Sequence, residues 1–245
     1  MKLNEEKIRQ YLTETIPIRL YDSIDSTNNE AKRHTESGVI LYATQHQTAG
    51  RGRRGHSFYS PKDTGLYMTL SLPLLDTPAD VQKITCAAGV AVCEAVTALS
   101  GQHPMIKWVN DIYLNGKKAA GILAELISDN HNRPRAVIIG IGLNLNTEHF
   151  PAEFAQNAGN FGDMDVNALC GTIADRLITL CTSVNNSVIE KYKTLNLCLG
   201  RTVTFERDGI PHTAKAVDID SNGGLVVDEK GIFLTLNSGE ISITV

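Results

Sequence analysis

The sequence predicts an α+β protein, in which a large domain of mixed helices and strands precedes a small β-barrel. Three observations favour this class. Strand-like apolar runs alternate with helical patterns through most of the chain. From about Leu199 the helical patterns stop, and short β-rich runs separated by turn signals continue to the end. The length of 245 residues fits a large domain plus a small one, which we place at 1–197 and 198–245.

The composition is that of an ordinary globular protein, with 42% hydrophobic and 20% charged residues. A formal net charge of −4 weakens a general nucleic-acid role, which usually shows as a basic domain. The five cysteines form no Cys-x-x-Cys pair, so we expect reduced thiols and no structural zinc. No apolar run approaches the roughly 18 residues of a membrane span and no signal-peptide core is present, so we expect a cytoplasmic protein with no membrane partner.

The first 20 residues predict a short polar helix and an extended lead-in, which is too little chain for a helix-turn-helix domain. In the following stretch, Thr27 and Glu30 have the spacing of a capping box, so a helix starts here with Ser26, Thr27 and Asn28 at its amino end. A helix start can hold polar ligand atoms. The same residues can also be caps and nothing more.

Residues 39–44 predict a buried strand that leads into the stretch 43–56, here called the Arg-Gly loop, in which three arginines stand among three glycines. Glycines let the backbone approach a ligand, and arginines offer forked donors that match phosphate or carboxylate oxygens. The loop therefore predicts anion binding. The alternatives are an exposed basic loop or an Arg-Gly segment that touches RNA.

Residues 66–72 alternate and predict a half-buried strand with Leu66, Met68, Leu70 and Leu72 on one face. The sequence Thr77-Pro-Ala-Asp80 then predicts an N-cap, a proline at the first helical position and an early acid, opening a helix to about Leu99. Small residues in this helix suit close packing on a sheet. We find no chemistry in it.

Asn115 and Gly116 stand between two apolar runs and predict a two-residue hairpin turn. The turn pairs Tyr113 with Lys118 and puts Lys118 on the same side as Asp111, whereas Lys117 points to the other face. A lysine on a rigid hairpin suits a carboxylate or an α-phosphate, and the neighbouring Asn110 and Asp111 can orient polar groups or a metal ion. Trp108 lies beside this polar cluster. The alternative is a surface hairpin with ordinary charges.

Residues 136–146 predict a strand in which Gly140 and Gly142 let a ligand or another backbone come close, and Asn144 and Asn146 at its end can bond a phosphate or ribose. The irregular stretch 147–163 can close over a ligand. Two core helices are predicted at 166–184 and 187–195. The β-rich runs of the predicted barrel are 201–205, 213–217, 224–227, 232–235 and 240–245.

Five motifs follow one another in the chain: Ser26-Thr-Asn28, Gln47-x-Ala-Gly-Arg-Gly-Arg-Arg-Gly55, Lys107-Trp-x-Asn-Asp111, Gly116-Lys-Lys-Ala-Ala-Gly-Ile-Leu123 and Gly140-Ile-Gly-Leu-Asn144. In this order they closely resemble the biotin protein ligases, from about residue 20 to the C-terminus. The resemblance implies a mixed β-sheet flanked by helices, related in fold to lipoate ligases and class II tRNA synthetases, and then an SH3-like barrel. The chain looks like the monofunctional type without an N-terminal DNA-binding domain, for which no DNA partner is expected.

The resemblance also implies an activity. Biotin and ATP give biotinyl-5′-adenylate and pyrophosphate, and the biotinyl group then passes to one lysine of a biotin carboxyl carrier domain of a carboxylase. Attack of a carboxylate on a phosphate brings anions together, so neutralising cations are needed more than a nucleophile. In the second step the acceptor lysine must lose its proton, for which Asp111 or solvent are the candidate bases.

Site residues are carried over by position. The family's biotin-binding residues correspond to Ser26, Thr27, Asn28, Gln47, Arg51, Gly52, Arg53 and Lys118. Its residues for ATP and the adenylate correspond to Arg53, Arg54, Lys107, Trp108, Asn110 and Asn144. Lys118, Arg53 and Asp111 are the catalytic candidates, and Asp111 is also the candidate ligand of Mg²⁺.

The sequence departs from the family pattern at two positions. Val109 stands where the motif usually has proline, which we expect to alter local rigidity only. His56 stands where an arginine often closes the loop, which bears on how firmly the loop holds phosphate. The stretch 147–163 does not align, so no adenine-contacting residue is assigned there. The oligomeric state stays open between a monomer and a weak homodimer.

Two alternative functions remain. A lipoate or octanoate ligase shares the fold and the chemistry, but its family has a different Arg- and Gly-rich pattern, so the loop seen here favours biotin. A non-enzymatic Arg-Gly nucleic-acid binder would instead show salt-sensitive nucleic-acid affinity and no need for Lys118.

Overall fold

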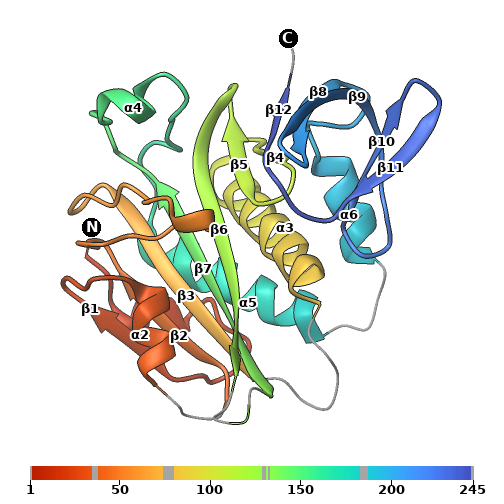
Figure 1. The fold of residues 1–245 in the computed structure, drawn as a ribbon. Coiled ribbons are helices and arrows are strands. Elements are labelled where there is room, and N and C mark those ends of the chain that lie inside the picture. The colour runs from red at the N-terminus through yellow and green to blue at the C-terminus, as the bar shows by residue number, and fades with distance from the viewer. Residues whose placement is uncertain are drawn as a thin grey trace.

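The computed structural model describes residues 2–34, 38–73, 80–128, 131, 133–182 and 187–243. Figure 1 shows a large twisted sheet with helices packed on it and a smaller sheet formed by the C-terminal part of the chain. The strands of the large sheet are β1 (Ile18–Tyr21), β2 (Ile40–Thr44), β3 (Gly65–Pro73), β4 (Met105–Lys107), β5 (Asp111–Leu114), β6 (Lys117–Ser128) and β7 (Pro134–Asn144).

The large sheet is mixed, with the strand order β1-β2-β3-β7-β6-β5-β4. Strands β1 and β2 are parallel, and every other neighbouring pair is antiparallel. The predicted α+β class with a mixed sheet is therefore confirmed.

Helices cover the two faces of this sheet unequally. On one face, α3 (Val81–Ser100) packs on β6 and β7, and α5 (Val166–Thr182) packs on α3 and β3. The helices α1 (Glu5–Arg9) and α6 (Ser187–Leu195) add to this layer by packing on α5 and α3, respectively. On the other face, α2 (Thr27–Arg33) lies over β2, β3 and β7. The short helix α4 (Ala152–Ala155) follows β7.

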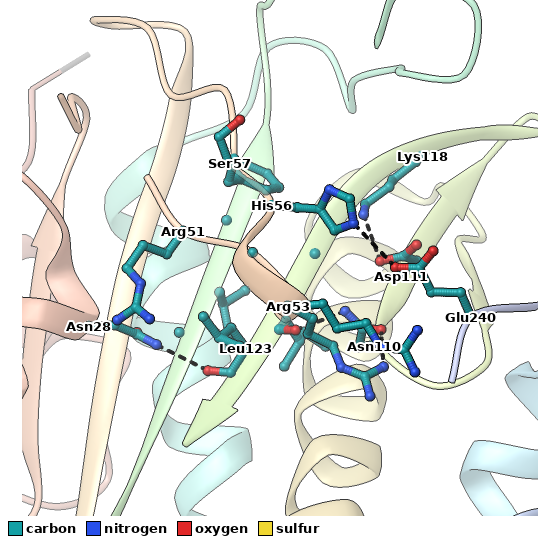
Figure 2. A pocket seen from close by; sticks show the side chains of 18 of the residues that line it. Asn28, Arg51, Arg53, His56, Ser57, Asn110, Asp111, Lys118, Leu123 and Glu240 are labelled. Carbon is teal, nitrogen blue, oxygen red and sulfur yellow. Dashed lines mark hydrogen bonds and ion pairs between the residues drawn. The ribbon is translucent and has the colours of Figure 1, made fainter. Parts of the chain in front are cut away.

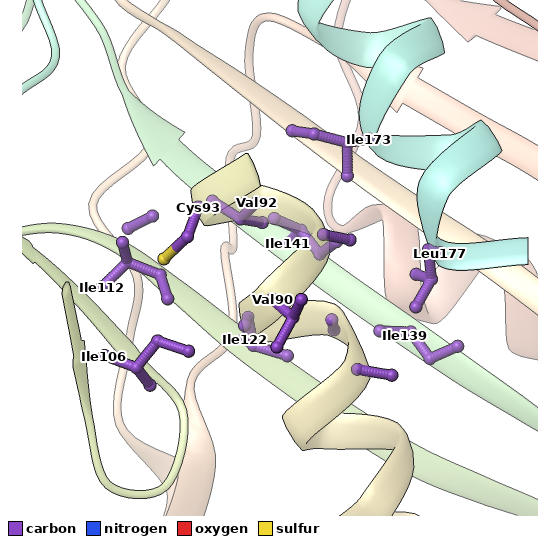
Figure 3. Close-up of a cluster of buried hydrophobic side chains, with 14 of the residues drawn as sticks. Val90, Val92, Cys93, Ile106, Ile112, Ile122, Ile139, Ile141, Ile173 and Leu177 are labelled. Carbon is purple, nitrogen blue, oxygen red and sulfur yellow. The ribbon is translucent and has the colours of Figure 1, made fainter. Parts of the chain in front are cut away.

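The main core lies between the sheet and the layer of α3 and α5. Figure 3 shows α3 side chains such as Val90 and Cys93 packed among strand residues such as Ile122 and Ile141. Within the described residues, α3 is the one helix whose length and composition pass for a membrane span, with a mean hydropathy of 1.4. The sequence predicted no apolar run near the length of a membrane span, and α3 is an exception by length and composition. The helix is mostly buried, however, as the central helix of a core is.

Strand β3 is buried on both faces, so the prediction of a half-buried strand was wrong. Leu66, Met68 and Leu70 point into the main core, as predicted. The opposite face carries Tyr67 and Thr69, which are equally buried because α2 and the chain around it cover this side. Alternation in a sequence reveals the two faces of a strand, but the layer that covers the second face comes from elsewhere in the chain.

Two predicted helix starts need correction. The N-cap of α2 is Ser26, whose Oγ accepts a hydrogen bond from the Asn29 N–H at 3.5 Å, and Thr27 is already helical. The N-cap of α3 is Asp80, which accepts from the N–H groups of the second and third helical residues, Gln82 and Lys83. Residues 77–79 of the predicted cap lie outside the described residues, as do 183–184 of the predicted helix before α6 and the last two residues.

The C-terminal sheet has five antiparallel strands in the order β11-β10-β9-β8-β12. They are β8 (Thr202–Arg207), β9 (Ile210–Ile219), β10 (Leu225–Glu229), β11 (Ile232–Leu236) and β12 (Ile241–Ile243). Turns at 208–209 and 230–231, each with positive φ at both residues, separate the β-rich runs, as the turn signals in the sequence predicted. The described pairings include none between β11 and β12, so closure into an SH3-like barrel stays a prediction.

Candidate functional site

A cavity of about 400 Å³ opens on the face of the large sheet that carries α2. Figure 2 shows side chains converging on it from α2, the Arg-Gly loop, the β5–β6 hairpin and the C-terminal part of the chain. Every predicted site residue lines this cavity except Asn144 and Asn146, and the Asn146 Nδ2 instead donates to Asp163 Oδ1. The structure thus brings together segments that are more than 90 residues apart in the chain.

The floor of the cavity is made of glycines on neighbouring strands, since Gly121 of β6 pairs with Gly142 of β7. A Cβ atom at Gly142 would lie 2.6 Å from the Phe58 ring, and one at Gly140 would collide with the Asn28 amide. The prediction that Gly140 and Gly142 permit a close approach is therefore confirmed. In this structure the approaching groups are side chains of the same protein.

One end of the cavity is a hydrogen-bonded cluster at the start of α2. The Oε1 atom of Gln47 accepts from the Thr27 N–H at 2.9 Å, and its Nε2 donates to Ser60 Oγ at 3.1 Å. Asn28 Oδ1 accepts from Thr69 Oγ1 at 2.6 Å. Ser26 alone acts as the cap, so the alternative that all three α2 residues are only caps does not hold. The polar groups of this cluster are neutral and are oriented by protein partners.

The Arg-Gly loop folds back on itself over the cavity. The Gly52 N–H donates to the His56 carbonyl at 2.7 Å, and a 3-10 turn, η1 (Arg53–Gly55), lies between them. Arg54 adopts a positive φ of 51° within the turn. Arg53 points inward, and its Nη1 donates to Asn110 Oδ1 at 3.0 Å. Burial, and then the nearby charge of Arg54, lower the pKa of Arg53, but a guanidinium remains protonated in proteins.

Two further contacts hold the Arg-Gly loop at its ends. Arg51 Nη1 donates to Asn29 Oδ1 at 3.0 Å, and Arg51 Nη2 lies 3.7 Å from Glu125 Oε1. On the other side, His56 Nε2 lies 3.6 Å from Glu240 Oε1 of the C-terminal part of the chain. His56 therefore occupies the family's arginine position while contacting a carboxylate that also lines the cavity.

The opposite wall carries the cationic groups of the β5–β6 hairpin. The predicted register is confirmed, with Tyr113 opposite Lys118 and positive φ at Asn115 and Gly116. Lys118 Nζ forms an ion pair with Asp111 Oδ1 at 2.7 Å. Lys117 is exposed, as predicted. The surface-hairpin alternative fails here because Lys118 and Asp111 both line the cavity.

The turn between β4 and β5 is held by three hydrogen bonds to the C-terminal half of the chain. The Trp108 N–H donates to Cys198 Sγ at 3.4 Å, and its indole N–H donates to the Gly223 carbonyl at 2.9 Å. The Val109 carbonyl accepts from the hydroxyl of the fully buried Tyr192 at 2.9 Å, and the Trp108–Val109 peptide bond is cis. The indole N–H of Trp108 is thus already paired, which leaves its ring to line the cavity.

Asn144 lies beside the main cavity and lines a second hollow of about 160 Å³. Its Nδ2 donates to the Gly159 carbonyl at 3.0 Å, and its buried Oδ1 has no partner among the described residues. The hollow adjoins Lys118 and is lined by the aromatic rings of Phe58, Tyr59, Phe150 and Phe154. The stretch 147–163 is irregular apart from α4, as predicted, and its backbone is bonded to the hairpin at Lys118.

Several residues at the site were not found from the sequence. Phe58 over the glycine floor follows the Arg-Gly loop without any pattern that marks it. Glu240 and Ser242 reach the cavity from the C-terminal part of the chain, whose role the sequence did not reveal. Gly121 is different, because it belongs to the motif that ends at Leu123, and that motif could have marked it as a residue of the cavity floor.

The comparisons with known proteins agree with this site. The model of the biotin/lipoate A/B protein ligase family matches residues 20–144, and that of the biotin protein ligase C-terminal domain matches residues 198–243. The chain belongs to the biotin/lipoate A/B protein ligase family. The first match contains the Arg-Gly loop, the hairpin and the glycine floor, and the second contains the strand that brings Glu240 to the cavity.

Individual members of the family match this chain over different shares of their own length. A biotin–[acetyl-CoA-carboxylase] ligase of Mycobacterium tuberculosis is 31% identical over 217 residues, which are 83% of this chain and 78% of that protein. The bifunctional ligase/repressor BirA of Bacillus subtilis is 39% identical over 62% of this chain, but the match spans only 49% of the relative. The biotin protein ligase of Aquifex aeolicus, solved with biotin and ATP, has a TM-score of 0.79 at 25% identity, covering 93% of this chain and 98% of that one.

Proposed function

We propose that this protein is a biotin–[acetyl-CoA-carboxylase] ligase of the cytoplasm. It activates biotin with ATP as biotinyl-5′-adenylate and transfers the biotinyl group to a lysine of a biotin carboxyl carrier domain. One observation carries the proposal: the cavity has an uncharged, hydrogen-bonding end at α2 and a cationic end at Lys118, Arg53 and Lys107. A ligand with a polar neutral ring and a carboxylate on a flexible tail, as biotin is, matches both ends. The family and the names of the relatives support the same assignment.

In the first step, a carboxylate oxygen of biotin attacks the α-phosphorus of ATP, an O–P bond forms, and pyrophosphate leaves. Lys118 pairs with Asp111 in the structure, and it exchanges this partner for the ligand carboxylate. Arg53 and Lys107 neutralise the phosphates. We place the adenine ring in the aromatic hollow next to Asn144, whose Oδ1 has no partner among the described residues and can accept a hydrogen bond from a ribose hydroxyl.

In the second step, the acceptor amine attacks the acyl carbon, AMP leaves, and the amine proton passes to Asp111 or to solvent. Mg²⁺ commonly binds through one carboxylate together with substrate phosphates, and Asp111 fits that role. Such an ion would neutralise phosphate charge. Among the described residues there is no group of three or more histidine, cysteine, aspartate or glutamate side chains that could hold a metal ion.

The test is to follow pyrophosphate release with ATP, Mg²⁺ and either biotin or lipoate, and to measure by mass spectrometry whether a carrier domain becomes biotinylated. We expect release with biotin and a mass increase on the carrier lysine. Release with lipoate alone would assign the protein to the lipoate branch of the same family. No turnover with either acid, together with salt-sensitive RNA binding, would favour the nucleic-acid alternative and contradict our mechanism.

A further inference from the structure

A carboxylate outside the cavity connects two parts of the candidate site. Glu125 lies on β6, two residues beyond Leu123, and its side chain is 20% exposed. Its Oε2 accepts from Asn28 Nδ2 at 3.0 Å, and its Oε1 pairs with Lys32 Nζ at 2.7 Å. The same Oε1 lies 3.7 Å from Arg51 of the Arg-Gly loop. One side chain therefore contacts two residues of α2, of which Asn28 lines the cavity, and the loop that covers the cavity.

The first consequence concerns the Asn28 amide. An ionised carboxylate can only accept hydrogen bonds, so the NH₂ group of Asn28 must face Glu125, and it donates to the Leu123 carbonyl as well. The Oδ1 atom is then directed to the opposite side, where Thr69 donates to it. Burial alone would raise the pKa of Glu125, but hydrogen bonds from Lys32 and Asn28 outweigh burial and lower that pKa. The carboxylate is thus ionised at neutral pH.

The second consequence concerns the Arg-Gly loop. Arg51 is exposed, and its contacts at this end of the loop run to Asn29 and to Glu125. Asn29 follows Asn28 on α2, and Glu125 of β6 accepts a hydrogen bond from Asn28. The contact that holds the loop and the contact that orients the Asn28 amide consequently share one charged group.

We propose that Glu125 is a positioning residue that orients the Asn28 amide and seats the Arg-Gly loop through Arg51. This deepens the proposed function, because the same carboxylate would prepare the uncharged end of the cavity for biotin and bring the arginines over it. Glu125 itself does not line the cavity and takes no part in the chemistry.

The test compares Glu125→Gln with Lys32→Met. A glutamine has the same shape but must present an NH₂ group to either Asn28 or Lys32, so one donor loses its acceptor. We expect Glu125→Gln to raise the KM for biotin at least about tenfold, as one lost charge-assisted hydrogen bond implies, with the KM for ATP changed less than twofold. Lys32→Met loses the same ion pair but keeps the Asn28 contact, and should raise the KM for biotin less than threefold.

A second readout needs no turnover. Trypsin can cut the loop at its three arginines, and we expect Glu125→Gln without ligand to be cut several times faster than wild type at a temperature where both proteins are fully folded. Arg51→Gln should be cut faster at the two remaining arginines, and combining it with Glu125→Gln should add little. If Glu125→Gln does not fold, Arg51→Gln alone decides the loop contact.

Two results would overturn the proposal: equal effects of Glu125→Gln and Lys32→Met on the KM for biotin, or cleavage rates of Glu125→Gln and Arg51→Gln that equal wild type. These outcomes are distinct from failure of the proposed function. In that case wild type itself would release no pyrophosphate with biotin, whereas the cleavage experiment would still report on Glu125 and Arg51.

Discussion

The two walls of the cavity are built by different means. The hairpin wall comprises β4, β5, β6 and the turn between β4 and β5. It is fixed by backbone ladders and by two buried hydrogen bonds, one donated by Tyr192 and one accepted by the Gly223 carbonyl. The loop wall, residues 51–57, is largely exposed and touches its surroundings through the side chains of Arg51, Arg53 and His56. The hairpin wall can hold charges in place before the ligand arrives, whereas the contacts of the loop wall can be exchanged for contacts to a ligand.

The largest effect is expected on the hairpin wall. Lys118→Ala should lower the rate of adenylate formation about 100- to 1,000-fold, because a fixed cation next to developing charge is worth that much. Lys117→Ala is the matched control, since Lys117 neighbours Lys118 in the chain but is exposed on the other face. Single-turnover pyrophosphate release measures both variants. Equal rates for the two would show that Lys118 has no special role.

The next largest effect is expected where Tyr192 supports the hairpin wall. Tyr192→Phe removes the hydroxyl that bonds the Val109 carbonyl and leaves that buried carbonyl unpaired, so the free energy of unfolding should fall by about 1 to 3 kcal/mol. Because Lys107 and Asn110 flank this turn, we also expect the KM for ATP to rise severalfold while the KM for biotin stays constant. Urea unfolding and steady-state kinetics test this pair of effects. A rise in the KM for biotin alone would contradict the separation of the two walls.

A change on the loop wall should have a smaller effect. His56→Arg restores the residue type that often stands here in the family and gives Glu240 a partner that is always charged. Because exposed ion pairs contribute little, the KM for ATP should fall by at most about fivefold, and so should the rate of tryptic cleavage after Arg51, Arg53 and Arg54. The substitution adds a trypsin site, so cleavage at each of the three original arginines is followed by mass spectrometry, with His56→Gln as the uncharged control. If these three sites were cut faster in the arginine variant than in wild type, the contact with Glu240 would not be holding the loop.

The smallest expected effect is on the stability of the protein at acidic pH. The folded state lowers the pKa of Glu125, so its ionised form stabilises the protein above the unfolded pKa of about 4.3. This contribution is lost as the pH falls through the lower, folded pKa. Urea unfolding between about pH 3 and pH 6 should therefore show a steeper loss of stability in wild type than in Glu125→Gln. Parallel curves would mean that Glu125 titrates alike in the folded and unfolded chains.

The sequence determined the features that depend on near neighbours in the chain. The Asn115-Gly116 turn set the register of the hairpin and hence the side on which Lys118 lies, because a two-residue turn leaves only one pairing. The glycines of β7 predicted that another group comes close to the strand, since only a residue without a Cβ atom leaves enough space for it. The motifs identified the family, and the turns of the C-terminal strands followed from their glycines.

Only the tertiary structure decided which distant groups meet. The covered second face of β3, Phe58 over Gly142, Glu240 at the cavity and the three partners of Glu125 all depend on how layers pack, not on a local pattern. Trp108 was predicted as a nucleotide residue from its motif, but its indole N–H is bonded to Gly223, which lies 115 residues away. Local periodicity predicts the face of a strand or helix on which a residue lies. Only the packing of distant segments decides which groups that residue contacts.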